Sequence, residues 1–270
     1  MKHKHIVNFS GGWCSFWAAK RVVDQHGPTD VTLLFADTII EDPELYLFNA
    51  KASALLGVPI TRVSKELTPW QLFRQQGMIA NNRFPICSIY LKREVLDGWI
   101  ETSCDPAQTT IYLGFDWTEQ HRLDHIRKSR PEWSFEAPMI EAPIWDKCRM
   151  QSEALKLGFM LPKLYELGFP HNNCGGRCVR AGISHWVHLW NTLPERYLEW
   201  EREELATIKE LTERGVSSAW FSFLRDRRGG TTKTMTLAAL RQRIEAGEVL
   251  DKHDWGGCGC GGVFEAEVVV

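Results

Sequence analysis

Short apolar runs alternate with segments of helical spacing along the first part of the chain. Residues 6–9 are an apolar run, and a Ser-Gly-Gly turn separates them from a segment of helical spacing that begins at Trp13. Residues 31–36 repeat the apolar run, and residues 43–56 repeat the helical spacing up to Gly57. This succession of strand, helix, strand and helix is typical of a parallel sheet with helices on its faces, so we predict an α/β fold.

The pattern continues with less regular elements beyond residue 57. We expect strands at 58–63, 109–114 and 141–145, and helices at 67–77, 89–100, 195–214 and 237–245. Polar residues follow the strand expected at 109–114, and ligands of open parallel sheets bind beyond the carboxyl ends of strands. We therefore predict an α/β domain over residues 1–150 and a mostly helical, cysteine-containing region over residues 151–270.

The overall composition excludes several classes of protein. Hydrophobic residues make up 44% of the 270 residues and charged residues 24%, as in ordinary globular proteins. A net charge of -2 creates no global attraction to nucleic acid or anionic lipid, so nucleic-acid binding would need a local basic patch. No stretch approaches the roughly 20 apolar residues of a membrane span, and the first apolar run is too short for a signal peptide. We therefore expect a cytoplasmic protein with no membrane partner.

The segment from Ser10 to Ser15 carries candidate phosphate-binding chemistry. It joins the first expected strand to the first expected helix, where free backbone amides and the positive end of the helix dipole favour anions. Gly11 and Gly12 allow close approach to the backbone, and the two serine hydroxyls can donate to phosphate oxygens. A purely structural turn is the alternative, since Gly-Gly turns are common.

With these residues the sequence resembles the PP-loop ATP pyrophosphatase superfamily, whose turn reads Ser-Gly-Gly-x-Asp-Ser. Within it, the chain is most similar to the branch of phosphoadenylylsulfate reductases and DNA phosphorothioation sulfurtransferases. The other matching segments are Asp37-Thr38 with Pro43-Glu44 and Phe48, Cys87 with Leu91-Lys92, and Leu113-Gly114-Phe115 through Arg122. The resemblance implies a Rossmann-like domain of the adenine nucleotide alpha hydrolase type, which binds ATP with Mg²⁺.

The resemblance also implies roles for the matched residues. The turn would hold the leaving pyrophosphate, and Asp37 would help to place magnesium or the nucleotide. Lys92 and Arg122 would offset the charge that develops in the transition state. The residues expected beside the nucleotide are Ser10, Gly11, Gly12, Cys14, Ser15, Asp37, Thr38 and Gly114.

Cys14 departs from the pattern, because the superfamily has an aspartate at this position. The usual arrangement of magnesium and phosphate is therefore in doubt, and Asp37 is a candidate for the missing carboxylate. A thiol at a helix N-terminus can have a lowered pKa and act as a nucleophile. A buried, unreactive cysteine is the alternative that we favour, since free cysteine is often a small core residue.

Four of the eight cysteines form two close pairs, Cys174 with Cys178 and Cys258 with Cys260. In a chain without an export signal, cysteines are more typical of thiols or metal ligands than of disulfides. The two pairs would supply four thiolates to a zinc ion or a [4Fe-4S] cluster, which the spacing does not distinguish; four unligated thiols are the alternative. The resemblance favours iron, and it makes Cys87 a fifth candidate, as a replacement ligand or as a catalytic redox or sulfur-carrying thiol.

These expectations combine into a hypothesis about function. The chain would use ATP to adenylate an acceptor, with a nucleobase or another nucleic-acid-related group as the acceptor, and would release pyrophosphate. Sulfur from a donor protein would then replace the activated oxygen, with the iron-sulfur cluster delivering or coordinating it. A reductase of adenylylated sulfate is the alternative within enzymes. A non-catalytic nucleotide- or metal-binding subunit of a modification or defence complex is a third hypothesis.

Overall fold

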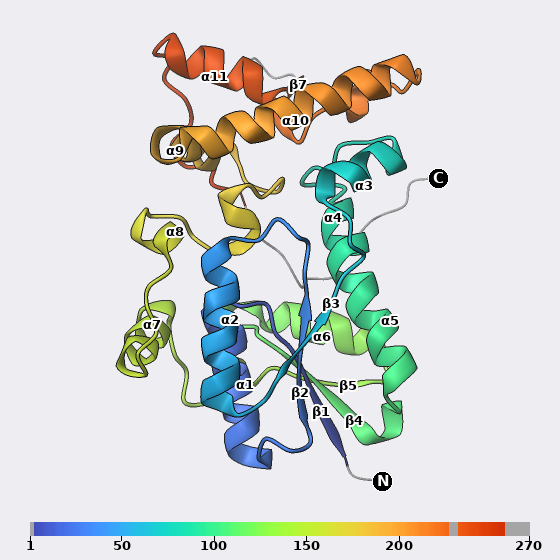
Figure 1. Cartoon of the computed structure of the whole chain (residues 1–270), viewed down its shortest axis with the longest axis vertical. Helices are drawn as coiled ribbons and strands as arrows, with labels where there is room; N and C mark the ends of the chain where they lie inside the picture. The colour runs from blue at the N-terminus through green and yellow to red at the C-terminus, as the bar shows by residue number, and fades with distance from the viewer. Residues whose placement is uncertain (1–2, 227–231, 257–270) are drawn as a thin grey trace.

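The computed structural model describes residues 3–226 and 232–256 (Figure 1). Its centre is a five-stranded sheet with the order β3-β2-β1-β4-β5, in which every neighbouring pair is parallel. The strands are β1 (Lys4–Asn8), β2 (Val31–Ala36), β3 (Ile60–Val63), β4 (Thr109–Leu113) and β5 (Ser134–Glu136). The strand order reverses between β1 and β4, so the sheet is doubly wound and Rossmann-like with its switch point there. The predicted α/β fold is confirmed.

Helices cover both faces of this sheet. Those on one face are α1 (Trp13–His26), α2 (Pro43–Leu56) and α7 (Lys147–Lys156), and those on the other are α5 (Glu94–Ser103) and α6 (Gln120–Ser129). Consecutive strand residues belong to opposite cores: Val7 and Leu33 pack on the α1 side, and Ile6 and Leu34 pack on the α5 side. Because strand side chains alternate between the two faces, the central strands are apolar at consecutive positions.

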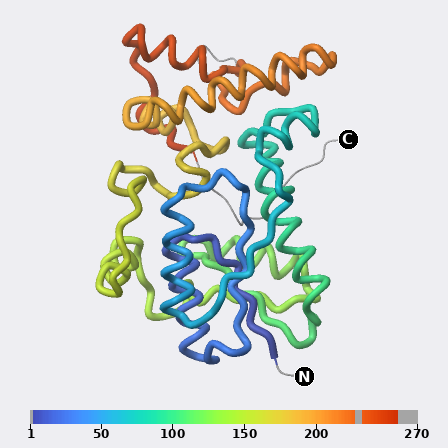
Figure 2. Tube along the Cα trace, viewed as in Figure 1, coloured from blue at the N-terminus to red at the C-terminus, as the bar shows by residue number. Residues whose placement is uncertain are grey.

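A mostly helical layer lies beyond the carboxyl ends of the strands (Figure 1). Its larger elements are α3 (Pro69–Gln76), α9 (Ile183–Thr192), α10 (Pro194–Glu213), α11 (Leu237–Glu245) and the antiparallel pair β6 (Leu224–Asp226) and β7 (Lys233–Met235). Figure 2 shows α3, in cyan, beneath the orange α10, and residues of both helices share one hydrophobic core. The layer is therefore built from two separate parts of the chain.

Short helical elements connect these layers. They are α4 (Ile86–Ser88), the π-helical η1 (Ile89–Arg93), α8 (Lys163–Glu166), and the 3-10 turns η2 (Pro106–Gln108), η3 (Trp117–Glu119), η4 (Pro138–Ile140), η5 (Asn173–Gly176) and η6 (Ser218–Trp220). Elements α4, η1 and α5 run on from one another, so the helix expected at 89–100 is longer than predicted. In the described part of the chain, none of the helices is both long and apolar enough to cross a bilayer.

Local sequence signals set the ends of α2. Asp42 caps its first turn by accepting from the Glu44 amide, Pro43 occupies the first helical position, and Gly57 ends the helix at φ 64°. These ends agree with the sequence prediction.

The strand predicted at 141–145 is wrong. These residues form a mostly exposed loop, and β5 supplies the fifth strand instead. Pro143 has no amide hydrogen to donate to a neighbouring strand, and exposed side chains give little burial energy to a strand here.

Hydrophobic cores extend across the predicted boundary between residues 150 and 151. Met150, Ala154 and Phe159 pack in the core that contains α1, while Trp70 and Phe73 pack in the core that contains α10. The division into two domains stays a prediction, and both predicted parts contribute to shared cores.

Candidate functional site

The glycine turn connects β1 to α1 and is fixed by close packing from two sides. Gly11 has φ 76°, and a Cβ there would lie 2.7 Å from Asn49 Oδ1. A Cβ at Gly114, just after β4, would lie 2.7 Å from the backbone N and Cα of Ser15. Both positions therefore require glycine, and the end of β4 is pressed against the turn.

The polar groups of the turn bond mainly to one another. Ser10 Oγ donates to Ser15 Oγ at 3.1 Å, and Ser15 Oγ donates to the Gly12 carbonyl at 2.9 Å and accepts from the Gly12 amide at 3.2 Å. Gly12 occupies the N-cap position of α1, and the first turn of α1 contains no acidic residue. The positive end of α1 is therefore not neutralised by a carboxylate of its own first turn, which favours an anionic ligand.

A cavity of about 420 Å³ lies at the carboxyl ends of β1, β2 and β4, beside the switch point. Of the predicted site residues, it is lined by Ser10, Lys92 and Gly114. Its wall is mostly apolar and includes Phe9, Leu34, Phe35, Leu96, Phe115 and Ile126. An apolar crevice of this size with a few convergent polar groups is typical of a small-ligand site.

The polar groups of the cavity come from several elements. Asn8 lines it, and Asn8 Oδ1 is buried without a hydrogen-bond partner among residues 3–226 and 232–256. Arg130 forms an ion pair with Asp97, and both line the cavity. Burial raises the pKa of Asp97 above its ordinary value, although Arg130 opposes the shift. Asn8 Oδ1 is therefore an acceptor that a polar ligand in the cavity could engage.

Lys92 reaches the cavity from a π-helical stretch and is held by a carboxylate that sequence reasoning missed. Lys92 Nζ lies 2.9 Å from Glu41 Oε1, which also accepts from Thr38 Oγ1 at 2.9 Å. Glu41 and Thr38 are both buried, although neither lines the cavity. A π-helical stretch is often found at functional sites. The sequence signal for Glu41 was only its place in a loop after a predicted strand.

Asp37 does not offer a free carboxylate. Its Oδ1 accepts from the Ile39 amide and from Tyr46 Oη, each at 2.8 Å, and its Oδ2 accepts from Arg62 Nε at 2.7 Å. Burial alone would raise the pKa of Asp37, but these hydrogen bonds hold it below its ordinary value. The carboxylate fixes the loop after β2, and its predicted role toward magnesium or nucleotide stays a prediction.

Cys14 lies at the start of α1 but packs into the core. Cys14 Sγ lies 3.6 Å from Met150 Sδ. Burial raises the pKa of Cys14 to about 12, and the charges of Asp116 and Glu119 add to the shift. A protonated thiol is a poor nucleophile, so the structure favours the packed cysteine over the activated one.

Arg122 belongs to α6 and lies over an aromatic ring. Its guanidinium carbon is 4.3 Å from the centroid of Phe115, and Nη1 is paired with Glu119. Nη2 is buried and has no hydrogen-bond partner among the described residues. Arg122 therefore keeps one donor available close to Phe115, a residue of the cavity wall.

The cysteines that the structure describes come together only in part. Cys174 lies in η5 in a left-handed conformation with φ 55°, and Cys178 is buried. Burial raises the pKa of Cys87 to about 12, and the nearby Cys174 adds to the shift. Cys87, which the sequence predicts as a replacement ligand or as a redox or sulfur-carrying thiol, lies near enough to Cys174 for their charges to interact.

The predicted four-thiolate site cannot be assembled from the described residues, because Cys258 and Cys260 lie outside them. Within residues 3–226 and 232–256, no three His, Cys, Asp or Glu side chains are arranged to hold a metal ion. Iron and zinc therefore both stay predictions.

Comparisons with known proteins name no family. No protein-family model matches the sequence, and no curated protein matches it significantly. What the structure establishes is the Rossmann-like α/β fold and a cavity beside its glycine turn.

Proposed function

We propose that this chain is an ATP-dependent enzyme of the PP-loop superfamily that adenylates an acceptor and releases pyrophosphate. The observation that carries the proposal is the meeting of the glycine turn with a 420 Å³ cavity at the switch point. Open α/β sheets bind nucleotides in this crevice, beside the amino end of the first helix. Three of the four segments that carry the family resemblance meet here, because Ser10, Lys92 and Gly114 line one cavity although they are far apart in the sequence. The matching residues of the 37–48 segment do not line it.

In the proposed reaction, an acceptor oxygen attacks the α-phosphorus of ATP. The bond between this phosphorus and the bridging oxygen breaks, and pyrophosphate leaves with the electron pair. The amides at the start of α1 stabilise the leaving group, and the hydroxyls of Ser10 and Ser15 add to this when they exchange their hydrogen bonds within the turn for bonds to phosphate oxygens. Lys92, which lines the cavity and pairs with Glu41, and Arg122, whose Nη2 has no hydrogen-bond partner among the described residues, are the cations that we propose to offset the developing charge.

Magnesium that accompanies ATP would neutralise phosphate charge, and its carboxylate ligand must come from outside the turn because position 14 is cysteine. The Asp37 carboxylate already accepts three hydrogen bonds. Asp116 and Glu119 are the carboxylates whose charges reach Cys14, and Glu119 is paired with Arg122. Asp116 Oδ1 likewise accepts from the amide and the hydroxyl of Thr118, so Asp37 and Asp116 are both candidate magnesium ligands.

Sulfur transfer is the second step that we propose, and it depends on the cysteines. The closeness of Cys87 to Cys174 and to Lys92 supports a group of thiols near the nucleotide site, and the raised pKa of Cys87 favours a metal-bound thiolate there over a free nucleophile. A cluster or zinc ion would be held by Cys174 and Cys178 with Cys258 and Cys260, or with Cys87 replacing one of them. The acceptor class that we propose is a nucleobase or another nucleic-acid-related group, with a separate protein as the sulfur donor.

The first test is product analysis with ATP and Mg²⁺ in the presence of nucleic acid as the acceptor. Pyrophosphate is expected, together with AMP that stays bonded to the acceptor until a nucleophile displaces it. Lys92→Met should lower the yield of pyrophosphate while Lys20→Met, at an exposed ion pair with Asp24, should not. Formation of ADP and phosphate would contradict adenylation. Sulfite release from an adenylylated sulfate would assign the chain to the reductases instead.

The cysteine chemistry has a separate test. Protein purified without oxygen should contain iron and acid-labile sulfide, and Cys174→Ser should remove both. Zinc in place of iron would make the cysteine site structural and would leave adenylation unaffected.

A further inference from the structure

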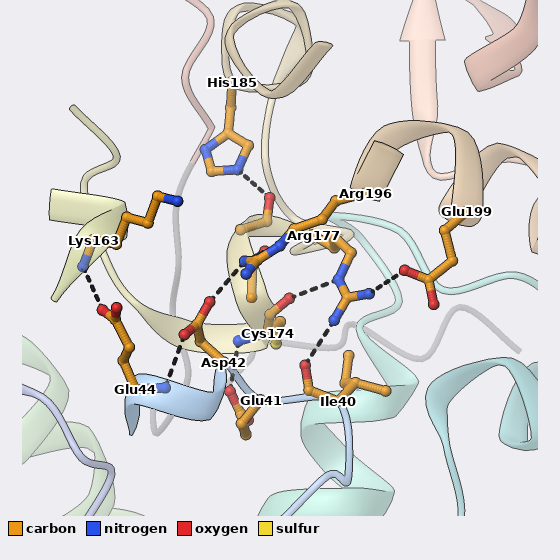
Figure 3. A network of polar contacts seen from close by, with 12 residues as sticks. Ile40, Glu41, Asp42, Glu44, Lys163, Cys174, Arg177, His185, Arg196 and Glu199 are labelled. Carbon is orange, nitrogen blue, oxygen red and sulfur yellow. Dashed lines mark hydrogen bonds and ion pairs between the residues drawn. The ribbon is translucent and has the colours of Figure 1, made fainter. Parts of the chain in front are cut away.

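Glu41 connects the cavity to the segment that carries Cys174. We call residues 173–177 the cysteine loop. Glu41 Oε1 is paired with Lys92, which lines the cavity. Glu41 Oε2 accepts from the Cys174 amide at 2.5 Å, as Figure 3 shows. Only 1% of the Glu41 side chain is exposed, so water contributes little to stabilising its charge. One buried carboxylate therefore depends on a cation at the cavity and on an amide in the cysteine loop.

The amide that Glu41 holds belongs to an unfavourable backbone conformation. Cys174 has φ 55°, and Gly175 and Gly176 follow with φ 57° and 80°. A left-handed conformation is disfavoured for a residue with a Cβ, and it persists only where surrounding contacts enforce it. The hydrogen bond to Glu41 is one such contact, so losing it should favour a different conformation of the cysteine loop.

Other contacts join the same two segments without involving Lys92. Arg177 Nη2 donates to the Ile40 carbonyl at 3.1 Å, and Arg196 Nη1 donates to Asp42 Oδ2 at 2.6 Å and to the Gly175 carbonyl at 3.1 Å (Figure 3). These contacts should keep the segments together when the bond to Glu41 is broken. They also provide a matched control, because Asp42 neighbours Glu41 in the sequence and pairs with Arg196.

We propose that Glu41 is a positioning residue that couples nucleotide binding to the conformation of the cysteine loop. The inference rests on the proposed nucleotide site. A phosphate group bound in the cavity competes with Glu41 for Lys92, because both are anions that attract the same ammonium. A buried carboxylate that loses its cation is strongly destabilised, so Glu41 moves and its hold on the Cys174 amide weakens. By linkage, a tightly held cysteine loop must in turn weaken nucleotide binding by the same factor.

The test combines ATP affinity, measured by calorimetry, with hydrogen exchange at the Cys174 amide, measured by mass spectrometry, on the full chain. In the wild type, ATP with Mg²⁺ should accelerate exchange at Cys174 by about 5-fold or more, a typical coupling factor. Glutamine has one acceptor oxygen, which cannot serve both Lys92 and the Cys174 amide, and it carries no charge to hold Lys92. Glu41→Gln should therefore exchange rapidly at Cys174 without ATP, should not respond to ATP, and should bind ATP about 5-fold more tightly. Asp42→Asn should retain the wild-type affinity and response.

The outcomes separate the coupling from the nucleotide site itself. Equal ATP affinity in the wild type and Glu41→Gln, with exchange at Cys174 unchanged by ATP, would overturn the coupling and leave the proposed function standing. No ATP binding by the folded wild type would overturn both. If Glu41→Gln fails to fold, Lys92→Met at saturating ATP gives a second test. Exchange at Cys174 should then be rapid with or without ATP, and slow exchange would refute the proposal.

Discussion

Replacing Gly114 by alanine should disrupt the nucleotide site while adding only one methyl group. The new Cβ would lie 2.7 Å from Ser15 N and Cα, whereas ordinary contacts begin near 3.4 Å. The neighbours are backbone atoms of the first turn of α1, which cannot rotate away. The end of β4 and the glycine turn must therefore separate by about 0.7 Å, a displacement that follows from these two distances.

The size of the effect follows from this displacement. Overpacking a close contact costs about 1–3 kcal/mol of stability, so the midpoint of urea unfolding should fall. Misplacing binding groups by nearly 1 Å should weaken ATP binding by about 10- to 100-fold. Calorimetric titration with ATP measures this loss directly, and circular dichroism checks that the variant is folded.

Gly98→Ala provides the matched control. Gly98 lies inside α5 with nothing within 4 Å of a Cβ, so alanine there should leave ATP affinity unchanged and add up to about 1 kcal/mol of stability. If Gly114→Ala binds ATP as tightly as Gly98→Ala does, the close packing of β4 on the turn does not matter for binding. That result would refute the prediction that the phosphates of ATP bind at the turn.

Three further predictions concern single side chains. Burial raises the pKa of Glu204 from 4.5 to about 8, so wild-type stability should fall as the pH rises through this range. Urea unfolding of Glu204→Gln should show a flatter pH profile, and an equal slope would contradict the prediction. Arg62→Met should lower the free energy of unfolding, measured in urea, by about 1–2 kcal/mol, because it removes the cation from the buried Asp37 carboxylate. Water compensates part of this loss, since Arg62 is half-exposed. Cys14 should react with iodoacetamide about 100-fold or more slowly than the exposed Cys148, and equal labelling in peptide mass spectra would contradict the raised pKa.

Much of the fold could be predicted because its signals are local. An apolar run followed by a glycine turn and helical spacing predicts a strand and a helix wherever it occurs. The ends of α2 depend on Asp42, Pro43 and Gly57, which act on backbone groups only a few residues away. The fifth strand was misplaced because β5 has only three residues, of which Phe135 alone is buried. Such a strand is defined by its pairing with β4, which leaves little trace in the local pattern.

The candidate site could be predicted only as a set of separate segments. The serine and glycine residues of the turn were identifiable from their place between a strand and a helix, and Lys92 was identifiable only through a family resemblance. Two contacts are seen only in the folded chain: Asp37 forms an ion pair with Arg62, and Lys92 forms an ion pair with Glu41. Each ion pair joins residues from different elements, and no local pattern records which carboxylate meets which cation.

The sequence by itself therefore determined the α/β class, the glycine turn and a pool of candidate cysteines. Each of these depends on residue type and on spacing over a few positions. The tertiary structure alone decided that three of the four matched segments meet at one cavity, that Cys14 is packed against Met150, and that the buried Glu41 carboxylate contacts both Lys92 and the Cys174 amide. Burial and long-range contacts set these features, because they arise only when distant segments are brought into one core and share its low dielectric.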